Sequence, residues 1–143
     1  MSETPIDADV LSLLAELPTP DAPLPASQQT AEQLRQTMRD SIAVFTRGAA
    51  SIVVPTVTDG TAPGRHGVIP VRIYSPAEPE SVLVYLHGGA WIVGDIDTHD
   101  FVTRRLCRDT SALVVSVDYR MLPEDPFPAP VDDAYDAVVW ASA

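Results

Sequence analysis

Short apolar runs and amphipathic runs alternate along this chain. Near its start, the apolar side chains of Val10–Leu17 recur at helical spacing and stop at Pro18, which predicts a short helix. Residues 18–25 are rich in proline, which favours an extended connector. A second helix is expected from an N-cap at Thr30 to about Arg47. Its apolar face is formed by Leu34, Met38, Ile42 and Phe45.

The middle of the chain changes to apolar runs of strand length. Ile52–Val57 and Val68–Tyr74 predict two strands joined by a turn rich in Gly, Pro and Asp, which would start a sheet in antiparallel fashion. Val82–Leu86 and Ala112–Val117 do not alternate with polar residues, and such runs are typical of parallel strands covered on both faces. The pattern therefore predicts an α/β fold with a mostly parallel sheet.

Two further amphipathic segments would cover this sheet. The first begins near Asp97 or Thr98, either of which can cap it. It is expected to turn three apolar residues inward, namely Phe101, Val102 and Leu106. The second begins near Pro130. Its sheet-facing side is expected to consist of Val131, Tyr135, Val138 and Val139.

A pair of glycines follows the strand Val82–Leu86 directly, in the segment His87-Gly88-Gly89-Ala90-Trp91. Adjacent glycines let the backbone turn sharply and expose its N–H groups, with no Cβ to block an incoming oxygen. Such a loop can bind an oxyanion, but a glycine turn needed only for tight packing leaves the same pattern. Trp91 is a candidate wall of a substrate pocket or an ordinary packing residue.

A second segment follows Ala112–Val117 and reads Asp118-Tyr119-Arg120-Met121-Leu122-Pro123-Glu124-Asp125-Pro126-Phe127-Pro128-Ala129-Pro130. In this order the two segments resemble the hormone-sensitive-lipase-like family of α/β-hydrolase-fold esterases, over about residues 66–142. That family has H-G-G-G-[WF] after its third strand and D-Y-R-x-x-P-E-x-x-F-P-A after its fourth. This chain departs from the pattern at Ala90, which keeps its N–H, and at Asp125, where the family commonly has His.

The resemblance implies the N-terminal half of an α/β-hydrolase fold in residues 51–143, preceded by a cap-like helical region in residues 1–50. Two helices that simply cover apolar surface are an equally good interpretation of the latter. The resemblance also implies a serine carboxylesterase that acts on a small ester. The oxyanion would be held by Gly88, Gly89 and Ala90, and His87 would fix their loop.

The catalytic residues of that family are absent from this chain. Its nucleophile is a Ser in a Gly-x-Ser-x-Gly elbow, followed by an acid and a His, whereas the last glycine here is Gly94. Ser116 lies within an apolar strand, where its hydroxyl is expected to bond to neighbouring backbone. The sequence thus predicts a truncated chain that is inactive alone. The rival hypotheses are a non-catalytic module that pairs with another chain and, more weakly, a glycine-loop protein that binds small anions.

Four polar residues after the strand Ala112–Val117 invite a catalytic interpretation: Asp118, Tyr119, Arg120 and Glu124. An Arg beside two acids more often forms an ion-pair network that fixes a loop, and this loop-positioning role is expected here. The alternating Asp95, Asp97 and His99 resemble the start of a calcium loop. Because Asp100 and Leu106 occupy the required glycine and glutamate positions, no metal site is expected.

Composition limits the classes of partner and cofactor that this chain can bind. A net charge of −11 disfavours nucleic acid and anionic membrane as partners, and no apolar run is long enough to span a bilayer. The chain has no Lys, which excludes a pyridoxal-phosphate Schiff base and a P-loop lysine, and no cofactor is expected. Its single Cys107 excludes an internal disulfide and predicts an apolar packing residue. The acidic start of the chain does not resemble a secretory signal, so a cytoplasmic protein is expected. Self-association is expected through the uncovered edge of Val82–Leu86.

Overall fold

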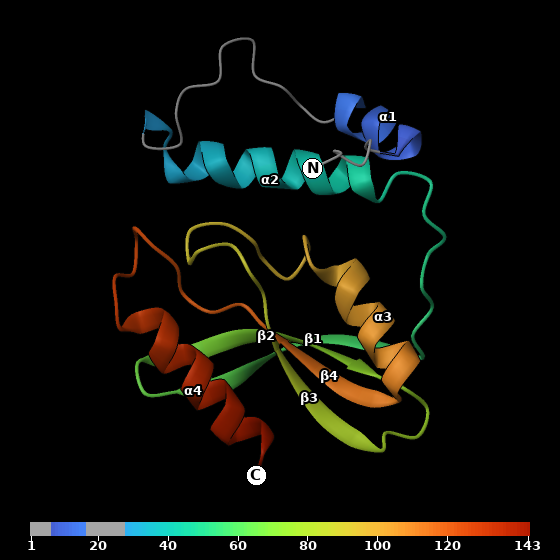
Figure 1. Ribbon diagram of the computed structural model, residues 1–143. Helices are drawn as coiled ribbons and strands as arrows, with labels where there is room; N and C mark the ends of the chain where they lie inside the picture. Colours follow the sequence, from blue (N-terminus) through green and yellow to red (C-terminus); the bar gives the residue numbers. More distant parts are fainter. Residues whose placement is uncertain (1–6, 17–27) are drawn as a thin grey trace, which may run out of the picture. The chain divides into compact units, whose positions relative to one another are not determined.

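The computed structural model describes residues 7–16 and 28–143, which fall into two compact units, Met1–Ala49 and Ala50–Ala143 (Figure 1). No helix within these described residues has the length and apolar character needed to cross a membrane. The site considered below lies in the second unit.

The first unit contains two helices, α1 (Ala8–Glu16) and α2 (Ala31–Phe45), close to the predicted bounds. The capping role of Thr30 is confirmed: its hydroxyl accepts from the Gln33 N–H at 3.2 Å, and the Gln33 side chain accepts from the Thr30 N–H at 2.8 Å. Arg47 and Glu16 form an exposed ion pair at 2.9 Å. The predicted stop at Pro18 and the connector of residues 18–25 lie outside the described residues.

The second unit is built on a four-stranded mixed sheet in the order β1-β2-β4-β3. Its strands are β1 (Thr56–Gly64), β2 (Gly67–Ser75), β3 (Ser81–Leu86) and β4 (Ala112–Val117). β2 pairs antiparallel with both β1 and β4, and β3 pairs parallel with β4. The predicted α/β architecture with an antiparallel start is confirmed.

The predicted position of the first strand was wrong. Ile52 and Val54 are buried but precede the strand, and β1 instead contains the Gly, Pro and Asp residues that suggested a turn. The turn is confined to Arg65 and His66, between the paired residues Gly64 and Gly67. An edge strand tolerates Gly and Pro because one side of its backbone needs no partner.

Two helices pack on opposite faces of the sheet, α3 (Asp100–Thr110) and α4 (Ala129–Ala141) (Figure 1). Alternate residues of β4 point to different faces, so Val114 packs with Cys107 of α3 while Val115 packs with Ala137 of α4. Cys107 is fully buried, which confirms its predicted packing role.

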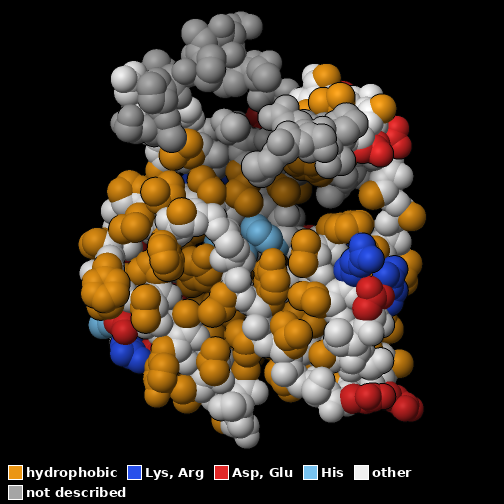
Figure 2. Space-filling model, in the orientation of Figure 1, with side chains coloured by type: hydrophobic (Ala, Val, Ile, Leu, Met, Phe, Trp, Pro, Cys, Tyr) orange, Lys and Arg blue, Asp and Glu red, His pale blue; other side chains and the backbone are white. Residues whose placement is uncertain are grey.

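The predicted inward faces of these helices need correction. In α4 the buried residues are Pro130, Asp133 and Ala137. The four residues expected there are 45–62% exposed: Val131, Tyr135, Val138 and Val139. The small Ala137 lets the helix approach the sheet closely, so the bulkier apolar stripe faces away from it. Figure 2 shows hydrophobic side chains spread over much of this face of the second unit.

The start of α3 also differs from the expectation. Thr103 and Cys107 are its buried residues, whereas Val102 is exposed. Its N-cap is His99, with no side-chain cap hydrogen bond. Thr98 instead exchanges hydrogen bonds with Asp95, and Asp97 binds the guanidinium of Arg72 at 2.7 Å.

Strand β3 was expected to be covered on both faces, and this holds only for its middle residues: Val84 packs against the core on one face, and Leu83 and Tyr85 pack on the other. Val82 is 55% exposed and Leu86 is 43% exposed, because β3 lies at the sheet edge and pairs only with β4 among the described residues. The expected bond of Ser116 is absent too. Its hydroxyl is buried and bonds to no group in the described part of the chain.

Candidate active site

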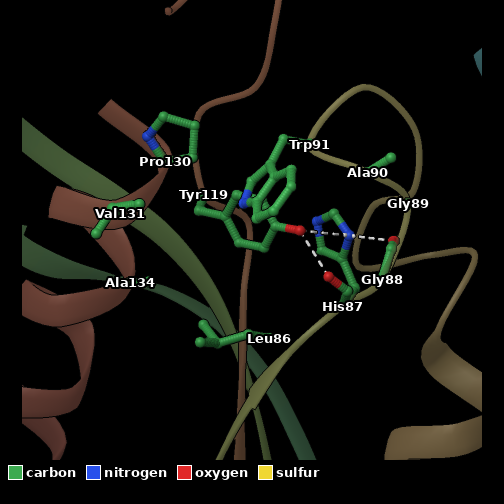
Figure 3. Close-up of a pocket in the computed structure, with 10 residues that line it drawn as sticks. All are labelled: Leu86, His87, Gly88, Gly89, Ala90, Trp91, Tyr119, Pro130, Val131 and Ala134. Atoms are coloured by element: carbon green, nitrogen blue, oxygen red, sulfur yellow. Dashed lines mark hydrogen bonds between the residues drawn. The ribbon is translucent and has the colours of Figure 1, made fainter. Parts of the chain in front are cut away.

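The site forms where β3 and β4 end side by side. Leu86 and Val117 are register partners in these parallel strands, so the loops that follow them leave the same edge of the sheet. The Leu122 N–H donates to the Trp91 carbonyl at 2.8 Å and ties the two loops together. Together with the start of α4, they enclose a cleft of about 280 Å³ (Figure 3). Its lining consists of Leu86, His87, Gly88, Gly89, Ala90, Trp91, Tyr119, Pro130, Val131 and Ala134.

The loop after β3 turns through an unusual run of backbone conformations. Gly89 has φ +136°, and a Cβ added there would lie 1.9 Å from the Val93 carbonyl oxygen. That close approach lets the Gly89 carbonyl accept from the N–H groups of both Ile92 and Val93 at 3.0 Å. Ala90 and Trp91 follow with φ +52° and +60°, a left-handed region that side chains disfavour. Strained backbone of this kind clusters at binding and catalytic sites.

Three consecutive amides in this loop are available to a ligand. The N–H groups of Gly88, Gly89 and Ala90 make no hydrogen bond within the described residues. A Cβ on Gly88 would meet open space. Adjacent unbonded amides beside an apolar cleft are the donors that an oxyanion site requires.

Buried His87 anchors the start of the loop. Its ring stacks on Tyr119 at 4.3 Å between centroids, and the Tyr119 hydroxyl donates to the His87 carbonyl at 2.6 Å. Nδ1 lies 3.0 Å from the Gly88 carbonyl, which can only accept, so Nδ1 carries the proton. Burial raises the pKa of the Tyr119 phenol and keeps it a donor.

Gly94, which the sequence analysis did not single out, is also required by this arrangement. It has φ +92°, and a Cβ there would lie 2.6 Å from both the Gly88 oxygen and Nδ1 of His87. Its place in the chain carries no motif, so only the folded loop reveals the contact.

Arg120 forms ion pairs, but with Asp133 of α4 and with Asp125 instead of with Asp118. The guanidinium binds the buried Asp133 at 2.7 and 2.9 Å, and the Arg120 N–H donates to the same carboxylate at 3.0 Å. Asp125 lies 3.8 Å away. Burial would raise the pKa of Asp133, but the hydrogen bonds from Arg120 outweigh it, and the pKa is lowered. Nothing in the sequence distinguishes Asp133 from other acidic residues near the start of a helix.

The other polar candidates lie in different surroundings. Asp118 is half-buried, its N–H donates to the Pro70 carbonyl at 2.9 Å, and burial raises the pKa of its carboxyl. Glu124 is exposed in the loop before α4. No group of three or more His, Cys, Asp or Glu in the described part of the chain could hold a metal ion.

Comparisons with known proteins agree with this geometry. A family model described as alpha/beta hydrolase fold matches residues 83–143. The four-stranded sheet and its flanking helices match the N-terminal part of the α/β-hydrolase fold. The resemblance to the hormone-sensitive-lipase-like esterases, drawn from the two sequence segments, is confirmed for this hydrolase-fold region by its relatives and solved neighbours.

Two sequence relatives are named carboxylic ester hydrolases. LipN of Mycobacterium tuberculosis is 52% identical over 87 residues, which are 59% of this chain and 23% of that protein. The carboxylesterase NlhH of the same species is 49% identical over 75 residues, which are 50% of this chain and 24% of that protein.

Solved esterases share the fold of the chain. The hyperthermophilic esterase from Pyrobaculum calidifontis has a TM-score of 0.81 and 38% identity, covering 98% of this chain and 44% of that one. An arylesterase has a TM-score of 0.77 and 30% identity, covering 96% of this chain and 45% of that one. The chain therefore spans less than half the length of these proteins.

The glycine loop generates a first prediction. Gly89→Ala places a Cβ against the Val93 carbonyl and is expected to lower the free energy of unfolding by about 2 kcal/mol or to displace the loop. Gly88→Ala, whose Cβ meets open space, is the control and should change stability by less than about 1 kcal/mol. Urea unfolding measures both, and equal costs for the two variants would contradict the assigned turn.

The carboxylates of buried Asp133 and half-buried Asp118 generate a second prediction, because their pKa values shift in opposite directions. Asp133→Asn should lower the free energy of unfolding at pH 7 by about 1.5–3 kcal/mol. The lowered native pKa means that the ionised pair stabilises the fold above about pH 4, so this deficit should shrink only below that pH.

Asp118→Asn should change the free energy of unfolding in the opposite direction. The raised native pKa means that ionisation of Asp118 destabilises the fold, so Asn should increase stability at pH 7. The gain should fade as the pH drops through the native pKa towards about 4. Urea unfolding of both variants from pH 3 to pH 8 provides the measurement, and shifts of the same sign would refute the two assignments.

Proposed function

We propose that this chain supplies the oxyanion-binding part of a carboxylic ester hydrolase site. The observation that carries the proposal is the run of unbonded amides at Gly88, Gly89 and Ala90, held beside an apolar cleft by a turn that only glycine can make at its centre. The carboxylic ester hydrolases among its relatives add support.

The chemistry is acyl transfer. A serine oxygen attacks the carbonyl carbon of a small ester, and the carbonyl π electrons move to its oxygen as the tetrahedral intermediate forms. The three amides donate to that oxyanion, and loss of one such donor typically costs about 3 kcal/mol of transition-state stabilisation. The chain contains no Gly-x-Ser-x-Gly, so the serine of this proposal belongs to a polypeptide segment outside the 143 residues.

The remaining residues act through the loop. In this proposal His87 and Tyr119 hold its first carbonyls, and Arg120 with Asp133 fixes the following segment to α4. Asp118 and Glu124 shape the same segment, and Trp91 forms a wall of the substrate cleft. For the helical region of residues 1–50 we propose a cap-like role, as the resemblance to the esterase family implies. We also propose a cytoplasmic localisation, because the single cysteine is free and buried, as is usual where thiols stay reduced.

Activity assays of a chimaera test the proposal. Residues 1–143 alone should show neither turnover nor an acyl burst with a short-chain active ester. Joined to the remaining part of the P. calidifontis esterase, they should gain turnover. In the chimaera, Gly89→Val should reduce kcat by about 100-fold or more, because the branched side chain forces the donors out of place.

The control for this experiment is Gly60→Val, a glycine of β1 with open space around its Cβ, which should leave kcat unchanged. Circular dichroism establishes that both variants fold. Turnover by residues 1–143 alone, or an unchanged kcat for Gly89→Val, would contradict the proposed role.

A second candidate function, an interaction module, is favoured by the uncovered edge of β3. We propose that the 143-residue chain self-associates through this edge, whose residues Ser81–Leu86 include no charge and no proline. Val82→Lys should therefore shift sedimentation towards monomer. Val68→Lys, at a similarly exposed position of the internally paired strand β2, should not. A wild-type chain that remains monomeric at high concentration would exclude this function.

A further inference from the structure

We infer that the cleft beside the oxyanion loop opens into a second, hydrocarbon-binding pocket, and that Val131 sets the length of the ester chain it accepts. The inference rests on the proposed function, because the carbonyl group of the same ester would occupy the three amides. It adds to that function a residue that determines which ester chains are accepted.

The second pocket, of about 230 Å³, lies next to the first. Trp91, Leu122, Phe127, Pro130 and Val131 line it, and their exposed surface in the pocket is apolar. Trp91, Pro130 and Val131 also line the cleft that holds the free amides. The two spaces therefore meet along these three shared side chains.

Trp91 is held at the boundary by its backbone. Its φ of +60° is strained for an aromatic residue, and its carbonyl is fixed by the Leu122 N–H at 2.8 Å. The indole nevertheless remains 56% exposed, so core packing does not explain the strain. Figure 3 shows the indole between Pro130 and the loop that carries Ala90.

The chemistry of the two spaces identifies the occupant. One end offers hydrogen-bond donors to a carbonyl oxygen, and the other offers only apolar surface. Phe127 is 79% exposed and Val131 is 49% exposed, so a chain laid against them would remove apolar surface from water. A charged or polar chain would lose its hydration there without finding a partner.

Val131 is the residue that can limit this chain. It lies in the first turn of α4, where its side chain borders both spaces. Val131→Phe should fill the second pocket while leaving the loop amides in place. Val138→Phe is the matched control, since Val138 lies on the same helix with 45% exposure and borders neither space.

NMR titration of the 143-residue chain tests the inference without requiring turnover. One series uses ethyl acetate, ethyl butanoate and ethyl hexanoate, and the other uses ethyl, butyl and hexyl acetate. All should shift the amides of Gly88, Gly89 and Ala90. In one series the methyl signals of Leu122 and Val131 should also shift, with Kd falling about fourfold per added methylene. The series that shows this dependence identifies whether the second pocket binds the acyl part or the alcohol part of the ester.

Val131→Phe should reduce the gain in affinity across this ester series to less than twofold. Val138→Phe should retain the full gain in affinity. Amide shifts with no dependence on chain length, or equal gains in both variants, would overturn the inference and leave the proposed function intact. Methyl shifts without amide shifts would support the pocket and count against the oxyanion role. The absence of both kinds of shift would overturn both.

Discussion

Parallel pairing of β3 with β4 is the interaction on which the site depends. It brings the ends of two strands to one edge of the sheet, although their last residues, Leu86 and Val117, lie far apart in the chain. The glycine loop and the segment after β4 can then share hydrogen bonds, such as the one between Leu122 and Trp91. Without this register the loop that carries the three amides would not border a cleft lined mostly by apolar side chains.

Buried polar groups convert this adjacency into a fixed geometry. The Tyr119 hydroxyl and the His87 ring satisfy carbonyls of the loop, and Asp133 satisfies the guanidinium and the backbone N–H of Arg120. Burying these polar groups costs little free energy while each one keeps its hydrogen-bond partner. Breaking one of the bonds is strongly unfavourable, because it leaves a desolvated group without a partner. In the proposed function, the donors are thereby held in place before a substrate arrives, as electrostatic stabilisation of an oxyanion requires.

Much of this organisation could be predicted from the sequence, for identifiable reasons. The glycine pair and the segment after β4 are local signals, and they located the loop, its strand and the family. Burial was harder to predict, because the sequence gives no direct sign of which face of α4 meets the sheet. Ala137 faces it, and Val138 does not. Gly94 and Asp133 were missed for a related reason, since each acts on a residue that only the folded chain brings near.

The central claim is that the amides of Gly88, Gly89 and Ala90 are unbonded while the turn that carries them is rigid. Hydrogen exchange of individual amides measures this most directly. The account predicts near-intrinsic exchange at these three residues, and protection at Ile92 and Val93, whose N–H groups donate to the Gly89 carbonyl. Protection of Gly89 and Ala90 comparable to that of β4 would contradict it, because those donors would already be bonded within the protein.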